Sequence, residues 1–286
     1  MILEGKIQEL PTLPGVAFEI NRLIADSNSS VADLERVLSK DQALTAKVLK
    51  LANSSFYAVP GGVTSVKKAL GFLGFNTIAQ LALGVSVFDV FARLGSSRFS
   101  IDDFWKHSLA VGLAAERIAK EISLPQHETA FTAGLLHDLG KLVQLKFDRT
   151  RFEAVLERTT KTASSFVAVE REQIRVAGED HAMVGWLAAK QWNFPATIQA
   201  AIRFHHDPAE TRTASDPLRK LVACVRIANQ IVVRQKLGFS GDCSEPEVGD
   251  QDMTDCGLTS EKLASIERWL DADFKKAGAL VHALAA

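Results

Sequence analysis

Apolar residues recur at intervals of three and four along almost the whole chain of 286 residues. This spacing places them on one face of an α-helix, whereas the alternation of apolar and polar residues that is typical of strands is scarce. The pattern therefore predicts an all-α fold, a multi-helix bundle. We expect helices within residues 16–26, 31–40, 41–53, 64–74, 76–94, 101–122, 130–147, 179–192, 195–206, 216–236 and 260–280.

The breaks between these helices predict the domain organisation. Ser30 is placed to cap the helix at 31–40. The polar stretch GSSRFS at 95–100 is the first long break after a set of about five helices. We expect an N-terminal helical part over 1–97, a second helical part over 98–236, and a C-terminal part over 237–286.

The C-terminal part is expected to begin with an acidic loop. Between Leu237 and Leu258 there are six acidic residues and no lysine or arginine. Such a composition favours a solvated, mobile segment. A final helix is expected to follow it.

Composition excludes some function classes without selecting one. The 33 Lys and Arg residues balance the 34 Asp and Glu residues, so no overall field favours nucleic acid or an anionic membrane. The first residues lack the pattern of a secretory signal, and the apolar run at 78–88 is too short to span a bilayer. The three cysteines have no metal-type CxxC spacing, and Cys224 is expected to be a buried thiol. We expect a cytoplasmic protein with no nucleic-acid or membrane partner.

His137 and Asp138 lie in the middle of an apolar stretch, AFTAGLLHDLGKLVQLKF, that is expected to be one helix. Asp138 falls on the apolar stripe of that helix. A buried carboxylate is costly unless a cation, a metal or hydrogen-bond donors compensate its charge. One hypothesis is an intrahelical ion pair with Lys141, worth about 0.3 to 0.5 kcal/mol. The other is a metal ion.

The histidines favour the metal. Six of the seven lie between residues 107 and 206. His107, His181 and His205 each share a stripe with apolar residues, so each is expected to point toward a core, as Asp138 does. His206 could reach the same place if the last turn of its helix loosens. A lone histidine on an apolar face is more often a core residue, but several together with a carboxylate are typical ligands of Fe, Mn, Zn or Ni.

The order of these residues resembles the HD superfamily of metal-dependent phosphohydrolases, in particular its HD-GYP branch. The resemblance implies that Asp138 bridges two metals and that Lys141 faces a phosphate. It further implies that the two metals are shared out among the histidines, with His107 and His137 serving one and His181, His205 and His206 the other.

Two departures from that pattern argue against hydrolysis of a cyclic dinucleotide. The final aspartate of the superfamily is replaced by Asn229, whose amide oxygen contributes a dipole where a carboxylate contributes a full charge. The Gly-Tyr-Pro signature is also missing, since the only tyrosine is Tyr57. A two-metal phosphodiesterase needs both cations.

The N-terminal half resembles the HDOD family, the HD-related output domain of bacterial signalling proteins. The resemblance rests on LPTLP at 10–14, on the segment 41–57 ending LANSSFY, and on ALGFLG at 69–74, and it extends over about residues 8–236. One departure is Gln42, where the family usually has proline. The resemblance implies a non-hydrolytic regulatory output with an N-terminal five-helix subdomain packed on an HD-like subdomain.

Two functional hypotheses follow. The first is a signal-transduction module that acts by protein–protein interaction on partners in trans, such as sensors, response regulators or cyclic-dinucleotide enzymes. Its degenerate site would hold a divalent transition metal at His107, His137, Asp138, His181, His205, His206 and Asn229. The second is a working metal-dependent phosphohydrolase acting on a nucleotide or phosphoester, with Asp138 and Lys141 in the chemistry. The sequence is compatible with an oligomer in either case.

Overall fold

The computed structural model describes residues 7–54, 56–91, 94, 96, 98–173 and 180–285. Regular structure within these ranges is helical, and strand-like pairing is limited to one isolated bridge between Ser96 and Phe99. The all-α prediction is confirmed. The chain divides into two compact units, one of residues 11–92 with 271–286 and one of residues 93–270 with 1–10. Residues 95 and 97 of the expected boundary lie outside the described residues.

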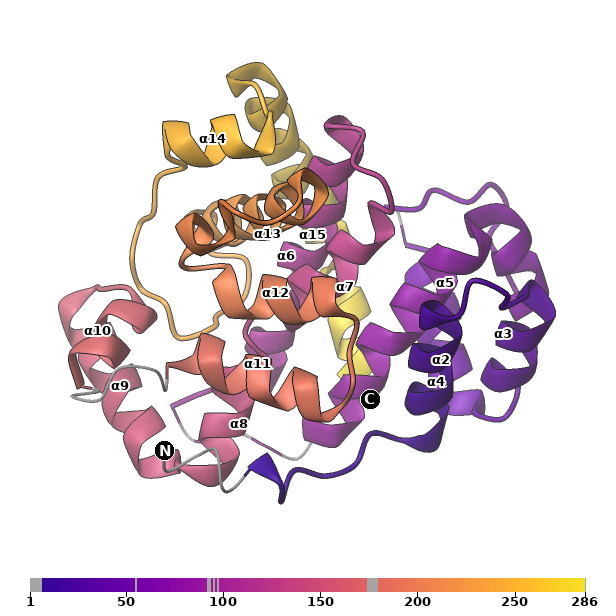
Figure 1. Ribbon diagram of the computed structural model, residues 1–286, viewed down its shortest axis with the longest axis horizontal. Coiled ribbons are helices and arrows are strands. Elements are labelled where there is room, and N and C mark those ends of the chain that lie inside the picture. Colours follow the sequence, from indigo (N-terminus) through magenta and orange to yellow (C-terminus); the bar gives the residue numbers. More distant parts are fainter. Residues whose placement is uncertain are drawn as a thin grey trace. The chain divides into compact units, whose positions relative to one another are not determined.

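The smaller unit is built around one long helix, α5, which contacts each of the other three (Figure 1). Ser30 caps α3 as predicted, in a capping box in which its hydroxyl accepts from the Asp33 backbone and the Asp33 carboxylate accepts in return. The helices that lie wholly within this unit are α2 (Gly15–Ala25), α3 (Val31–Leu38), α4 (Gln42–Ala52) and α5 (Val66–Phe91).

The helix α5 unites two segments that were predicted as separate helices. Gly74 adopts φ 80° and ψ 170°, a conformation open to glycine, and kinks the element where the break was expected. By length and composition alone, Val66–Phe88 could cross a membrane, but 67% of its most apolar window is buried inside the protein. This burial is typical of a core helix.

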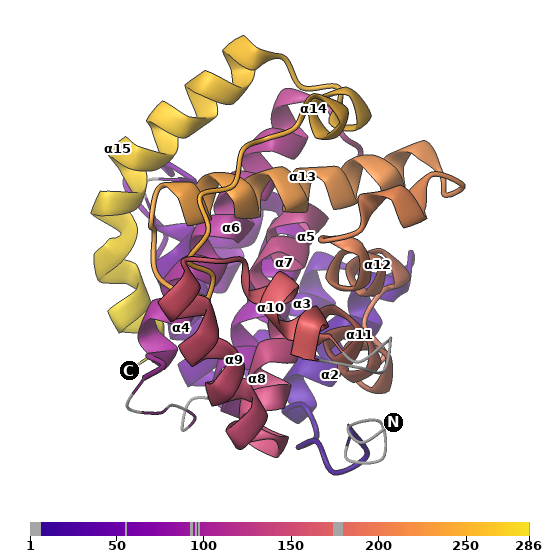
Figure 2. The same cartoon turned by 90° about the vertical axis from the view of Figure 1, so that its left-hand side faces the viewer.

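The larger unit packs α6 against α7 and α13, α8 against α11, and α12 against α7 (Figure 2). Residues of α15 from Asp271 onward belong to the smaller unit. The elements are α6 (Ile101–Glu121), α7 (Glu128–Leu136), α8 (Leu139–Phe147), α9 (Arg149–Thr162), α10 (Phe166–Gln173), α11 (His181–Gln191), α12 (Ala196–Phe204), a short 3₁₀ helix (Pro208–Thr211), α13 (Asp216–Arg234), α14 (Asp250–Cys256) and α15 (Ser260–Ala285).

Three sequence predictions were wrong in this unit. The single helix expected at 130–147 is two, because the chain turns at His137 and Asp138 between α7 and α8. Helices α9 and α10 were not predicted at all, because each buries only three or four side chains and therefore has a short apolar stripe. The segment 237–258 is not a solvated loop, because it contains α14 and because Ser240 and Asp252 are buried.

Glycines let the helices that carry the histidines approach closely. A Cβ on Gly140 of α8 would lie 1.8 Å from the carbonyl oxygen of His181 in α11. A Cβ on Gly112 of α6 would lie 2.8 Å from the carbonyl oxygen of Phe131 in α7. Neither position has room for a side chain, so backbone contacts bring these elements to one place.

Candidate metal centre

The buried carboxylate of Asp138 is the centre of the histidine cluster. Its Oδ2 lies 3.3 Å from Nε2 of His137 and 3.9 Å from Nε2 of His107. Its Oδ1 lies 3.2 Å from Nε2 of His181 and 3.6 Å from Nε2 of His205. All five side chains are at most 2% exposed. Each oxygen of the carboxylate therefore faces its own pair of imidazoles.

His206 completes the second group. Its Nε2 lies 3.0 Å from Nε2 of His181. The candidate ligand atoms of Asp138, His181, His205 and His206 all lie within 4.8 Å of one another, and so do those of His107, His137 and Asp138. The structure thus brings the predicted histidines and Asp138 together, with Asp138 common to both groups. That metals bind there stays a prediction.

Several polar atoms in this cluster have no hydrogen-bond partner, although they are buried. A buried polar atom without a partner costs about 1 to 3 kcal/mol. Imidazole nitrogens and carboxylate oxygens that converge in this way suit Fe, Mn, Zn or Ni, so the residues fit a transition metal. The unpartnered atoms are Nε2 of His107, His137 and His205, Oδ1 of Asp138 and Oδ1 of Asn229.

Backbone carbonyls set the tautomers of two histidines. Nδ1 of His137 lies 2.7 Å from the carbonyl oxygen of Gly134, and Nδ1 of His205 lies 2.8 Å from that of Ile202. A carbonyl can only accept, so each Nδ1 carries the proton and donates it. Each Nε2 then presents its lone pair to the centre, as a metal ligand must.

Glu170 orients His181 and was missed by the sequence analysis. Its Oε2 lies 2.7 Å from Nδ1 of His181, and its Oε1 accepts from the amide of Gln144. A buried carboxylate behind a histidine is a recurrent support of metal ligands. The signal was present in the sequence, because Phe166, Val169 and Glu170 follow the spacing of one helical face.

Lys141 supplies the intrahelical ion pair of the simpler hypothesis. Its Nζ lies 2.7 Å from Oδ2 of Asp138, 3.5 Å from Oγ of Ser240 and 4.8 Å from the ring centroid of Phe166. The lysine is only 2% exposed. The ion pair and the histidine cluster therefore coexist on one carboxylate. Contact between Lys141 and a phosphate stays a prediction.

Burial and neighbouring charges shift the pKa values of the cluster in opposite directions. Burial alone would raise the pKa of Asp138, but His137 and Lys141 hold it well below its usual range. Burial opposes protonation of His181, yet the Glu170 carboxylate raises its pKa to about 9. Burial lowers the pKa of His205 to about 4. In the metal-free cluster, His181 is therefore protonated below a pH of about 9.

Metal affinity is expected to rise with pH between about 6.5 and 9. A metal needs the Nε2 lone pair of His181, which carries a proton below its pKa of about 9, so binding releases that proton. Each released proton makes affinity rise about tenfold per pH unit. Titration of the metal-free protein with Mn²⁺ at several pH values in this range measures the slope. An affinity independent of pH would contradict the assignment.

Replacing Glu170 with glutamine is expected to weaken metal binding about 10- to 100-fold, because His181 loses its orienting carboxylate. The pH dependence of binding should also become shallower. The matched control is Glu172→Gln on the same helix, whose carboxylate is exposed and pairs with Arg158. Equal affinities of the two variants in a chelator competition would exclude a supporting role for Glu170.

Asn229 lies close enough to His107 to interact with its imidazole. It also lines a pocket of about 270 Å³ together with His205 and His206. A second pocket, of about 300 Å³, is lined in part by His107. The cluster is therefore bordered by two small cavities, and the position of the missing aspartate faces one of them.

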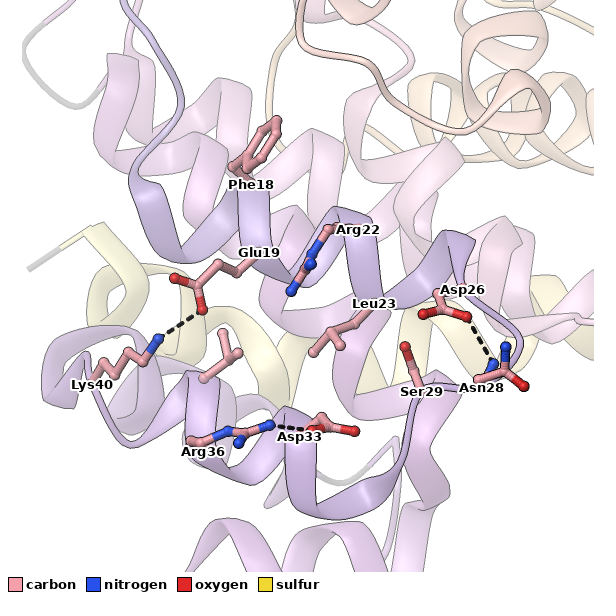
Figure 3. Close-up of a pocket in the computed structure, with 11 residues that line it drawn as sticks. Phe18, Glu19, Arg22, Leu23, Asp26, Asn28, Ser29, Asp33, Arg36 and Lys40 are labelled. Carbon is pink, nitrogen blue, oxygen red and sulfur yellow. Dashed lines mark hydrogen bonds and ion pairs between the residues drawn. The ribbon is translucent and has the colours of Figure 1, made fainter.

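A larger hollow in the smaller unit has fewer groups suited to catalysis or metal binding. This hollow of about 790 Å³ lies between α2 and α3 (Figure 3). Its charged side chains are largely paired with one another, as in Lys40 with Glu19 and Arg36 with Asp33, and the described residues that line it include no histidine or cysteine.

Cys224 is buried, as predicted, 3.7 Å from the sulfur of Cys256. Burial raises its pKa well above the usual range, so it is a neutral thiol and a poor nucleophile.

Comparison with known proteins places these features in a family. The chain is similar to a crystal structure from Shewanella amazonensis SB2B that is provisionally described as a phosphohydrolase. The two sequences are 25% identical, the TM-score is 0.76, and the match covers 100% of this chain and 98% of that one. A structure from Marinobacter aquaeolei VT8, provisionally described as a signal transduction protein, is 23% identical with a TM-score of 0.75, covering 100% of this chain and 61% of that one. An uncharacterized protein of Treponema pallidum (strain Nichols) is 25% identical over 231 residues.

The Treponema match covers 80% of this chain and 43% of the relative, so the chain spans less than half of that protein's length. The sequence profile of the HDOD domain matches residues 10–208, which include α2 through α12 and all the clustered histidines. The chain belongs to the HDOD domain family.

Proposed function

We propose that this protein is a regulatory output module of bacterial signalling, which binds partner proteins and holds a metal that controls this binding. Membership of the HDOD family supports the proposal, as does the likeness to the Marinobacter protein described as acting in signal transduction. The partners are sensors, response regulators or cyclic-dinucleotide enzymes, supplied in trans. The metal, when bound, supplies a Lewis-acidic cation that fixes the arrangement of the histidines.

The observation that carries the proposal is that, among the described residues, the cationic side chains at the cluster and in its two pockets are already paired with carboxylates. Lys236 lines the pocket beside His107 and lies 3.5 Å from Glu245. Arg171 lines the pocket beside His206 but donates to Asp180 and Asp207. Arg226 lines the same pocket and donates to Asp252 and to backbone carbonyls. Lys141 is paired with Asp138. A phosphohydrolase uses cationic side chains to bind and stabilise a phosphoryl group.

The second candidate is an active metal-dependent phosphohydrolase. The two ligand groups that share Asp138 favour it, as does the provisional assignment of the Shewanella relative. Under this candidate Asp138 holds both cations and Lys141 interacts with the phosphate. Asn229, at the place of the family's final aspartate, argues against it.

Metal content and turnover of the purified protein separate the two candidates. We expect bound transition metal and no hydrolysis of bis(p-nitrophenyl) phosphate above the level of an Asp138→Asn variant. Affinity capture from the native cell should retain a signalling partner with the wild type and lose it with the same variant. Hydrolysis that the wild type performs and the variant does not would reject the regulatory proposal.

Replacing Asn229 with aspartate is expected to strengthen metal binding by about tenfold or more on the His107 side, because a carboxylate adds a full charge beside the cation. The measurement is retention of metal against a chelator, compared with the wild type. An unchanged affinity would mean that residue 229 does not face a metal.

A further inference from the structure

A segment beyond the matched family region lies against the metal centre. Residues 238–246, here named the strap, follow α13 and lead toward α14 (Figure 2). Gly238 adopts φ +73°, and a Cβ there would lie 2.3 Å from the backbone nitrogen of His107. The Phe239 backbone N–H donates to the carbonyl oxygen of Asp103 at 2.9 Å. The strap therefore packs against the helix that carries His107.

The strap also contacts α8 and the start of α10. Ser240 is 2% exposed, and its Oγ lies 3.5 Å from Nζ of Lys141. The carboxylate of Asp242 accepts from the Phe166 backbone N–H at 3.2 Å. The Cys243 backbone N–H donates to the carbonyl oxygen of Ser164, also at 3.2 Å. One short segment thus contacts three elements that position ligands or their support.

The two cavities beside the cluster share strap residues. Asp242 and Ser244 line both the pocket that includes His107 and the pocket that includes His205. A change in the position of the strap would therefore change access to the cluster from both pockets.

Lys141 links the strap to the metal centre. Its ammonium is bonded to Oδ2 of Asp138, the oxygen that faces His107 and His137. A metal bound by these three residues would compete with Lys141 for that oxygen, and two neighbouring cations repel each other. Ser240 is the only other polar side chain within hydrogen-bonding distance of Lys141 among the described residues.

We propose that metal binding tightens the strap through Lys141, so that the strap is the part of the chain that reports metal occupancy to partners. Displacement of the ammonium from Asp138 moves it toward Ser240, so that the present 3.5 Å approach shortens into a charge-assisted hydrogen bond between α8 and the strap. The inference rests on the proposed function, because it requires a metal at Asp138. It adds the segment by which occupancy is transmitted.

Hydrogen exchange of the full chain with and without Mn²⁺ tests the proposal. We expect amides of the strap to exchange on the order of tenfold more slowly when Mn²⁺ is bound. Lys141→Met should bind Mn²⁺ but show the same strap exchange with and without it. The matched control is Lys146→Met, an exposed lysine on the same helix, which should respond as the wild type does.

Electron paramagnetic resonance of the same samples reports whether Mn²⁺ is bound. If Mn²⁺ is bound and strap exchange is unchanged or faster, the strap proposal is wrong and the metal centre stands. If Mn²⁺ does not bind, both are wrong. If Lys141→Met does not fold without metal, Ser240→Ala replaces it, because this variant should have a loose strap in either state. A metal response of Ser240→Ala equal to that of the wild type would overturn the proposal.

Discussion

Asp138→Asn is expected to abolish metal binding, reducing affinity by at least about 100-fold at both positions. The reason is that Asp138 offers one oxygen to each group of histidines and, among the described residues, is the only carboxylate common to both. An amide at this position removes a full negative charge from beside both cations. Elemental analysis after equilibration with metal measures the loss.

Two further variants make this result interpretable. Removing the carboxylate leaves Lys141 as an unpaired buried cation, which costs about 3 to 5 kcal/mol. The double variant Asp138→Asn with Lys141→Met removes both charges and should fold while lacking metal. Asp148→Asn, at the other end of α8, should keep its metal, because Asp148 lies outside both ligand groups. Retained metal in the Asp138 variants would contradict the site.

Gly140→Ala is expected to destabilise the protein by about 3 kcal/mol or more and to weaken metal binding at the same time. The new Cβ would lie 1.8 Å from the carbonyl oxygen of His181 and 2.7 Å from the backbone nitrogen of Gly185. Both neighbours are backbone atoms, so α8 and α11 must separate, and His181 moves away from Asp138. Urea unfolding and metal titration of the variant measure the two effects.

The control for this substitution is Gly71→Ala. Gly71 lies in the helix α5, and a Cβ there would have no heavy atom within 4 Å. Alanine at this position should stabilise the helix by about 0.5 to 1 kcal/mol, because glycine is a poor helix former. If both variants had the same stability, the close contact of α8 with α11 would be disproved.

The helices that carry strong apolar periodicity could be predicted from the sequence. The stripes on α6, α11 and α12 also indicated correctly that His107, His181 and His205 point inward. The helices with short apolar stripes were missed, since α9 and α10 bury only a few side chains each. Tertiary contacts determine such segments more than local propensity does.

The residues that support the candidate ligands, Glu170 and Ser240, were not predicted. Glu170 lies on α10, which was missed, and Ser240 lies in the segment 237–258, whose acidic composition favoured a loop. Two glycines of this segment adopt positive φ and pack closely against other elements, Gly238 against α6 and Gly241 against Phe166. A sequence pattern contains no information on which distant backbone a glycine will contact. The turn between α7 and α8 could not be recognised in the sequence, because apolar residues continue on both sides of Asp138.

Anomalous X-ray diffraction from crystals grown with Mn²⁺ tests the central claim most directly. We expect anomalous peaks within bonding distance of Asp138, one beside His107 and His137 and one beside His181, His205 and His206. Clear density for Asp138 and Lys141 as an ion pair, with Mn²⁺ in excess and no anomalous peak at the cluster, would contradict it.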